Sequence, residues 1–213
     1  VLYHWRIIPA SVASDITAKP YVLAASKAVR EDALKRRGID GIVEELPGYH
    51  GYFRVNYNLR AETLVSIIIP TRDNHDVLSR CISSITDKTA WKHYEIVIVD
   101  NGSQKRETLD YLDKVALNDN ISVIRHDKPF NFSELNNVGV GHAKGSLLLF
   151  LNDDTEVLQE DWLQRLGGYA QQKHVGAVGA KLVYADGHTI QHTGVLNLQT
   201  GPVHAYIGHD KNN

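Results

Sequence analysis

The distribution of apolar residues changes character near residue 60 of the chain. From Leu64 onward, short apolar runs alternate with segments whose apolar residues recur every three or four positions, as on one face of a helix. The runs are continuous rather than alternating, which is typical of parallel strands buried on both faces. The pattern therefore predicts an α/β domain with a mostly parallel, doubly wound sheet and helices on both of its faces. The candidate strands cover residues 65–69, 95–99, 121–124 and 147–151.

Two further signals in the second half of this region predict a helix start and a hairpin. Ser133 is the predicted N-cap of the helix that precedes the fourth strand and runs to about Ala143. Beyond Val175, residues 178–184 and the residues from Ile190 onward flank an Asp-Gly pair at 186–187. Such a pair between apolar segments predicts a β-hairpin.

The first sixty residues have a different texture. Residues 15–37 have the pattern of an amphipathic helix, and Gly38 provides a C-terminal stop. Residues 52–59 alternate like a half-buried strand. We expect an α/β N-terminal extension over residues 1–60, followed by the main domain over residues 61–213.

Composition and charge exclude several classes of protein. The chain has 213 residues and a formal net charge of −2, so it has no general attraction to nucleic acid or to anionic membranes. Cys81 is the only cysteine, so no internal disulfide can form, and a cytoplasmic setting is expected. No apolar run approaches the roughly 20 residues that a spanning helix needs. Methionine is absent even at position 1, from which we expect the chain to be a piece of a longer protein.

Polar residues follow three of the four predicted strands. The first strand is followed by residues 70–73, the second by residues 100–103 and the fourth by residues 152–156, and each group contains at least one carboxylate. Ligands of open α/β sheets bind outside the carboxyl ends of the strands, so these carboxylates should share one crevice. Such a cluster needs compensation, and Mg²⁺ or Mn²⁺ would supply it while bridging carboxylates to phosphate oxygens. Each group alone also fits a tight turn or a helix cap.

Four motifs in a fixed order identify a resemblance. They are VSIIIPTRD at 65–73, IVDNGS at 98–103, NNVG with AKG at 136–145, and FLNDDT at 150–155. Together they resemble the family-2 glycosyltransferases, which have the Rossmann-like GT-A fold, over about residues 64–195. The resemblance implies a domain that binds a nucleotide-sugar and a divalent cation.

The resemblance also implies roles for particular residues. Residues 70–73, which are Pro70, Thr71, Arg72 and Asp73, would line the nucleotide pocket, with Thr71 and Asp73 reaching the base or the ribose. Asp100 is similar to the acid that contacts uracil or thymine in this family.

Four later residues complete the implied site. Asn137 and Lys144 match positions that orient the nucleotide and its phosphates. Asp153 matches the middle of the D-x-D motif, near the ribose, and Asp154 matches the last acid, which binds the metal. The first position is Asn152, so one anionic ligand is replaced by a neutral one.

The Asn-Asp-Asp-Thr form and residues 190–195 resemble the members that build surface polysaccharides, including rhamnosyltransferase-like ones. That subset implies an inverting transfer of a sugar from a UDP- or dTDP-linked donor to a saccharide or lipid-linked acceptor. Lipid-linked acceptors would bring the full-length protein to the inner face of the membrane as a peripheral protein. No motif before Asn213 matches the family's catalytic base, so we expect the acceptor-binding part and this base to lie outside the chain.

Other functions were compared with this one. Nucleotidyltransferases and dinucleotide-dependent oxidoreductases need a glycine-rich loop after the first strand, and residues 70–74 contain no glycine. A degenerate, non-catalytic binding module stays open as an alternative because of Asn152 and the absent base. Glu156 fits a capping role, and His192 and His204 fit structural roles better than pocket roles.

Overall fold

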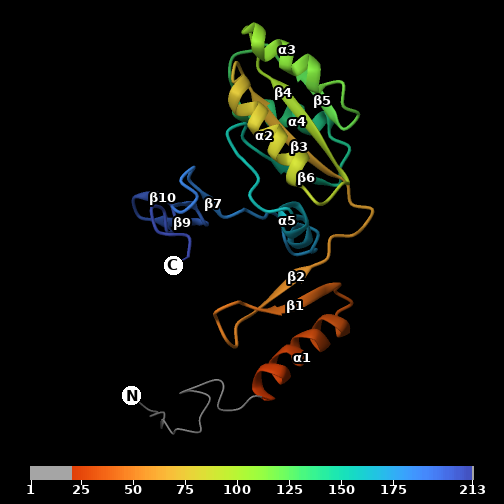
Figure 1. Ribbon diagram of the computed structural model, residues 1–213, viewed down its shortest axis with the longest axis vertical. Coiled ribbons are helices and arrows are strands. Elements are labelled where there is room, and N and C mark those ends of the chain that lie inside the picture. Colours follow the sequence, from red (N-terminus) through yellow and green to blue (C-terminus); the bar gives the residue numbers. More distant parts are fainter. Residues whose placement is uncertain (1–20, 213) are drawn as a thin grey trace. The chain divides into compact units, whose positions relative to one another are not determined.

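The computed structural model of the chain describes residues 21–212 (Figure 1). Contacts between residues divide the chain into two compact units, Val1–Arg60 and Ala61–Asn213. Each unit is described by itself.

Within its described residues, 21–60, the first unit consists of one helix and a β-hairpin. Helix α1 covers Tyr21–Arg36, so the predicted helix is present from Tyr21 onward, while positions 15–20 lie outside the described residues. Strands β1 (Gly41–Glu45) and β2 (Phe53–Tyr57) pair antiparallel. The α/β character of the extension is confirmed. The sequence pattern missed β1, because a five-residue strand with a glycine and two glutamates has no apolar periodicity of its own.

The second unit is built on a four-stranded parallel sheet. Its strands are β3 (Val65–Thr71), β4 (Tyr94–Asp100), β5 (Ile121–Arg125) and β6 (Leu147–Phe150), in the order β5-β4-β3-β6. All three pairings are parallel, which confirms the predicted parallel sheet. All residues of β4, and all of β3 except Pro70, are buried, as the continuous apolar runs indicate.

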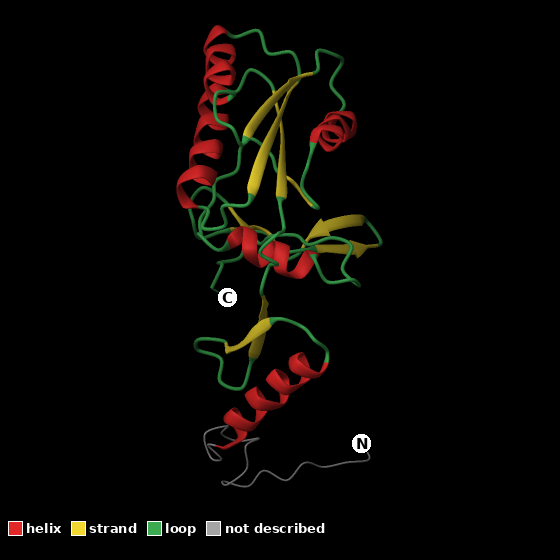
Figure 2. Ribbon diagram, turned by 90° about the vertical axis from the view of Figure 1, so that its right-hand side faces the viewer, coloured by secondary structure: helices red, strands yellow, loops and turns green. Residues whose placement is uncertain are grey.

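Helices cover both faces of this sheet (Figure 2). On one face, α4 (Phe132–His142) packs Leu135 against Ile68, Val97 and Val99. Successive strand residues point to opposite faces, so the neighbouring isoleucines of β3 and β4 point to the other face. There α2 (His75–Lys88) and α3 (Arg106–Val115) lie along the sheet (Figures 1 and 2).

The sequence placed the start of α4 two residues too late. Asn131, not Ser133, is the N-cap, because its side chain accepts a hydrogen bond from the Glu134 backbone N–H at 3.1 Å. Both residue types cap helices well, and the pattern alone did not distinguish them.

The chain after β6 forms helix α5 (Trp162–Ala170) and two hairpins. The predicted hairpin around Asp186-Gly187 is present as β7 (Leu182–Val183) and β8 (Ile190–His192), although β7 is shorter than predicted. A second hairpin, β9 (Val195–Leu198) with β10 (Gly201–His204), was not predicted. No helix within residues 21–212 has the length and hydropathy needed to cross a membrane.

Gly139 tests how closely α4 approaches the sheet. A Cβ atom there would lie 2.4 Å from Cγ2 of Ile68, whereas one at Gly141 of the same helix would meet nothing within 4 Å. We expect Gly139→Ala to lower the free energy of unfolding by about 1–3 kcal/mol through overpacking. Gly141→Ala, the matched control, should be neutral or stabilise by up to ~1 kcal/mol. Urea unfolding of both variants measures the difference, and equal stabilities would contradict the close packing.

Candidate functional site

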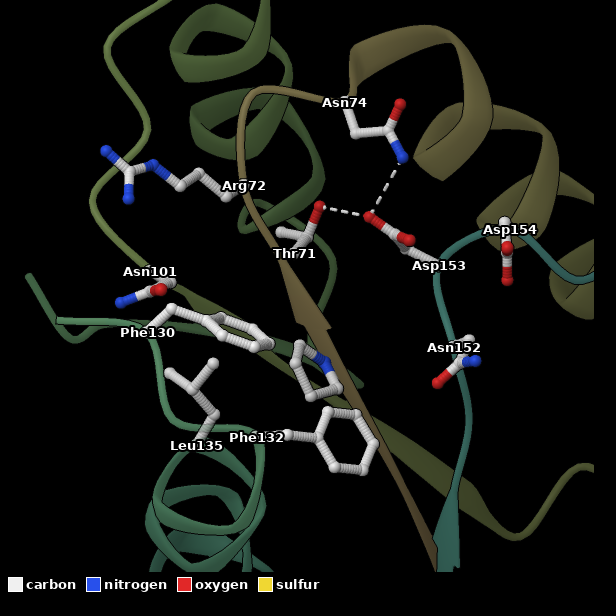
Figure 3. Close-up of a pocket in the computed structure, with 11 residues that line it drawn as sticks. Thr71, Arg72, Asn74, Asn101, Phe130, Phe132, Leu135, Asn152, Asp153 and Asp154 are labelled. Atoms are coloured by element: carbon white, nitrogen blue, oxygen red, sulfur yellow. Dashed lines mark hydrogen bonds between the residues drawn. The ribbon is translucent and has the colours of Figure 1, made fainter.

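A pocket of about 290 Å³ opens where the carboxyl ends of β3 and β6 meet the segment between β5 and α4 (Figure 3). One part of its lining is polar and acidic, and the other part is apolar and aromatic. The polar residues are Thr71, Arg72, Asn74, Asn101, Asn152, Asp153 and Asp154, and the apolar residues are Pro70, Phe130, Phe132 and Leu135. The pocket therefore lies at the sheet edge where the sequence predicted a crevice.

Asp153 joins the segment after β6, residues 151–157, to the end of β3. We call this segment the acidic loop. Its Oδ2 atom accepts hydrogen bonds from Thr71 Oγ1 at 2.7 Å and from Asn74 Nδ2 at 3.2 Å (Figure 3). Two donors on one carboxylate oxygen offset much of the cost of holding this charge in a partly buried position. The Oδ2 atom of Asp153 is therefore occupied by protein donors, and only its Oδ1 atom is left for a ligand.

Asp154 is the acid of this pocket whose negative charge no described protein group stabilises. It is exposed, and it makes no hydrogen bond or ion pair with any of the residues 21–212. Asn152, two residues earlier, is also exposed and adds an amide group to the same lining. Oxygen donors of this kind fit Mg²⁺ or Mn²⁺.

The protein alone does not build a complete cation site. Within the described part of the chain, no group of three or more His, Cys, Asp or Glu residues is arranged to hold a metal ion. A cation at Asp154 would therefore need further ligands from water or from a bound ligand, which is how Mg²⁺ commonly binds beside substrate phosphates.

Helix α2 supports the acidic loop from inside the unit. Ser84 Oγ accepts a hydrogen bond from the Val157 backbone N–H at 3.0 Å, and Lys88 Nζ donates to the Val157 carbonyl at 2.8 Å. The Sγ atom of buried Cys81 lies 3.8 Å from the Asn152 carbonyl oxygen. Glu156 pairs with Arg80 at 3.2 Å on the exposed side, so it serves the loop rather than the pocket.

Asp100 is buried behind the pocket rather than in its lining. Its Oδ1 atom accepts the Ser103 backbone N–H at 2.9 Å, and its Oδ2 atom pairs with Arg125 Nη1 at 3.0 Å. The structure therefore does not bring this carboxylate, which the resemblance assigned to the base, to the pocket surface. Both of its oxygens are already engaged by the protein.

Asn101, which was predicted to lie at the crevice but was given no individual role, lines the pocket. Its Nδ2 atom donates to the carbonyls of His126 at 3.0 Å and Lys128 at 2.8 Å. These two acceptors fix the orientation of the amide, so Oδ1 is the atom left over. Oδ1 is buried and has no hydrogen-bond partner among the described residues. An unpaired buried acceptor costs about 1–3 kcal/mol, which a ligand donor would recover.

Asp73 is directed away from the pocket by its backbone. Its φ is +51°, and its Oδ1 atom accepts the backbone N–H groups of Gln104 at 2.7 Å and Lys105 at 2.8 Å, at the start of α3. These backbone donors, that of Lys105 first, lower the pKa of the Asp73 carboxyl. Its neighbours Pro70, Thr71 and Arg72 line the pocket, but Asp73 does not.

Two other predicted residues also lie outside the pocket. Asn137 is exposed on α4 and is not part of the lining. Lys144 lies at the opposite end of the sheet, where its backbone N–H donates to Glu95 Oε1 at 2.5 Å and its Nζ is 3.8 Å from Glu95 Oε2. Because Glu95 and Lys144 mark the amino ends of β4 and β6, Lys144 is not placed to orient phosphates in this pocket.

His192 and His204 contact each other, with their Nδ1 atoms 2.8 Å apart. This contact links β8 to the end of β10, and neither ring lines the pocket.

Comparison with known proteins was made on this geometry. Residues 66–203 match the family described as Glycosyl transferase family 2. The uncharacterized protein y4gI of Sinorhizobium fredii is 40% identical over 197 residues, which are 92% of this chain and 22% of that protein. The O-antigen biosynthesis protein RfbC of Myxococcus xanthus is 39% identical over 157 residues, which are 74% of this chain and 12% of that protein. The chain therefore spans less than a quarter of the length of each of these relatives.

Among solved structures, the chain is similar to the mannosyltransferase PcManGT from Pyrobaculum calidifontis, in complex with GDP-Man and Mn²⁺. The TM-score is 0.48 and the identity is 16%, over 79% of this chain and 46% of that one.

The reactivity of the Cys81 thiol measures how closely α2 packs beneath the acidic loop. Burial raises the pKa of its thiol to about 11, with Thr155 contributing a hydrogen bond in the opposite direction. At pH 8 the thiolate fraction is then roughly a hundredfold lower than for a thiol with the ordinary value near 9. We expect a thiol reagent at pH 8 to modify Cys81 slowly in the native chain and rapidly in urea. Immediate, stoichiometric modification of the native chain would contradict the described packing of α2 beneath the loop.

Proposed function

The chain belongs to glycosyl transferase family 2, and on that premise we propose that its pocket holds the nucleoside diphosphate of a UDP- or dTDP-linked sugar donor. One observation carries the proposal. The same pocket contains the uncompensated carboxylate Asp154 and the unpaired buried acceptor Asn101 Oδ1, and Figure 3 shows them on opposite sides. A nucleoside diphosphate has matching parts, because its phosphates need a cation and its base carries N–H donors.

The acidic side is the proposed position of the diphosphate. Asp154 and the Asn152 amide oxygen would hold Mn²⁺ or Mg²⁺ there, with the diphosphate supplying further oxygens. When bound, the cation supplies Lewis-acid stabilisation of the negative charge on the departing diphosphate. Asp153, held by Thr71 and Asn74, is left with Oδ1 free for a ribose hydroxyl.

The side of Asn101 is the proposed position of the base. Uracil and thymine each have one ring N–H between two carbonyls, and Asn101 Oδ1 is an acceptor whose orientation is fixed. We assign this contact to Asn101 rather than to Asp100. The role left to Asp100 is positioning, because it ties the Ser103 backbone and Arg125 around the turn that carries Asn101.

The reaction proposed for the full-length protein is an inverting sugar transfer. A base takes the proton from an acceptor hydroxyl, the oxygen forms a bond to C1 of the sugar, and the bond from C1 to the diphosphate breaks. The described residues provide the donor side of this reaction. The similarity to a protein of O-antigen biosynthesis supports surface polysaccharide synthesis on a saccharide or lipid-linked acceptor. A lipid-linked acceptor would place the full-length protein in the cytoplasm, peripherally at the inner face of the membrane.

A second candidate is a non-catalytic member of the family that binds ligand without transfer. It is favoured by Asn152, which replaces the first acid of the D-x-D motif, and by the incomplete cation site of residues 21–212. The two candidates differ in what the chain binds: the transferase binds a nucleotide in a cation-dependent way, and the non-catalytic member binds a glycan without any nucleotide.

Calorimetric titration of the chain with UDP and dTDP, with and without Mn²⁺, tests the proposal. We expect binding that requires Mn²⁺ and that Asp154→Ala weakens by at least about 10-fold, since even outer-shell partners of metal ligands contribute 10- to 100-fold. Glu156→Gln is the matched control, because it removes a carboxylate of the same loop that pairs with Arg80 outside the pocket.

The other outcomes are equally decisive. A folded chain that binds neither nucleotide contradicts the proposed function. Binding of a glycan without any nucleotide would establish the non-catalytic candidate. Nucleotide binding that is unchanged in Asp154→Ala would contradict the assignment of the cation to this residue.

A further inference from the structure

Phe130 is an unusually exposed aromatic residue at the pocket. Its side chain is 70% exposed although phenylalanine is normally buried, and it belongs to the pocket lining. Figure 3 shows Phe130 and Asn101 on the same side of the pocket. An exposed apolar face beside an unpaired buried acceptor is the kind of surface that a flat ligand with an N–H edge would cover.

The segment that carries Phe130 is held in place from two sides. The carbonyls of His126 and Lys128 accept the two hydrogen bonds from the Asn101 amide, so Asn101 and this segment are coupled directly. On the other side, His126 Nε2 lies 2.9 Å from Glu134 Oε1, and Lys128 Nζ donates to the same oxygen at 3.3 Å.

The end of the segment is also anchored, since Asn131 caps α4. The backbone on both sides of Phe130 is thus fixed before any ligand arrives. A backbone that is fixed in advance loses little conformational entropy on binding, so more of the contact energy contributes to affinity.

We propose that Phe130 is the surface on which the nucleobase of the donor stacks, while Asn101 Oδ1 accepts a hydrogen bond from the edge of the same base. This inference rests on the proposed function, because it assigns one part of the proposed nucleotide to one wall of the pocket. The face contact and the edge contact then come from a single structural element, since the Asn101 amide holds the backbone two residues before Phe130.

The other parts of the nucleotide fit this wall less well. The diphosphate is charged and belongs with a cation at Asp154, and the ribose presents hydroxyl groups that an aromatic face cannot satisfy. The base is the flat, polarisable part, and stacking on aromatic side chains is the common way in which proteins hold bases.

Titration of the full chain with UDP and, separately, with inorganic pyrophosphate, both in Mn²⁺, tests the assignment. We expect Phe130→Ala to weaken UDP binding by roughly 5- to 100-fold and Phe130→Tyr to retain it, because base stacking on an aromatic ring contributes in that range. Pyrophosphate has no base, so its affinity should be the same in all variants. Leu117→Ala is the matched control: Leu117 is 84% exposed in the turn before β5, at the amino end of the sheet.

The failure of this inference differs from the failure of the proposed function. If the unmodified chain binds UDP and Phe130→Ala binds it equally well, stacking on Phe130 is wrong while the nucleotide site stands. Equal losses for UDP and pyrophosphate would also overturn the inference, because they would show a general effect on the pocket. If the unmodified chain binds neither UDP nor dTDP, both proposals fail; if it binds dTDP alone, the same comparison of variants is made with dTDP.

Discussion

The pocket depends on the parallel pairing of β3 with β4 on one side and β6 on the other. In a parallel sheet the carboxyl ends of neighbouring strands lie at one edge, so three segments that are far apart in the sequence meet there. The pairing continues past the strands themselves, because the Asn101 backbone N–H donates to the Thr71 carbonyl at 2.9 Å and that of Leu151 to the Ile68 carbonyl at 3.0 Å. Asn101 and the acidic loop after β6 are therefore aligned by the same backbone hydrogen bonds that hold the sheet.

This alignment places four carboxylates near one edge of the sheet. The negative charge of three of them is stabilised by hydrogen bonds or an ion pair within the protein. Asp100 is buried and pairs with Arg125, Asp73 accepts backbone N–H groups at the start of α3, and Asp153 accepts side-chain donors from Thr71 and Asn74. Asp154 alone has no such partner among residues 21–212. The difference separates three acids with structural partners from the acid proposed to bind the cation, and it could not be read from the spacing of the acids along the chain.

The sequence was sufficient for the sheet and for the crevice at its carboxyl edge. Continuous apolar runs predicted all four parallel strands, although only β3 and β4 are buried along nearly their whole length and β6 exposes Leu148 and Phe150. The hairpin strands β1, β9 and β10 could not be predicted, because each is short and gains its conformation from its partner. Lys144 was assigned by resemblance alone; it precedes β6, and the start of a parallel strand lies at the amino edge of the sheet.

The sequence also could not predict which side chains at the strand ends point into the pocket. Asp100 and Asn101 are neighbours, and the choice of which one enters the pocket depends on hydrogen bonds to Arg125, His126 and Lys128 that no local pattern reveals. Phe130 gave no clear signal, because it occupies the position before the N-cap Asn131, where hydrophobic residues are common at helix starts.

A crystal structure of the chain with UDP and Mn²⁺ would show whether this pocket holds the nucleotide. We expect electron density for the diphosphate and the cation at Asp154, with the nucleotide extending across the pocket toward Asn101. A nucleotide bound elsewhere, for example beside Lys144 at the amino edge of the sheet, would contradict it.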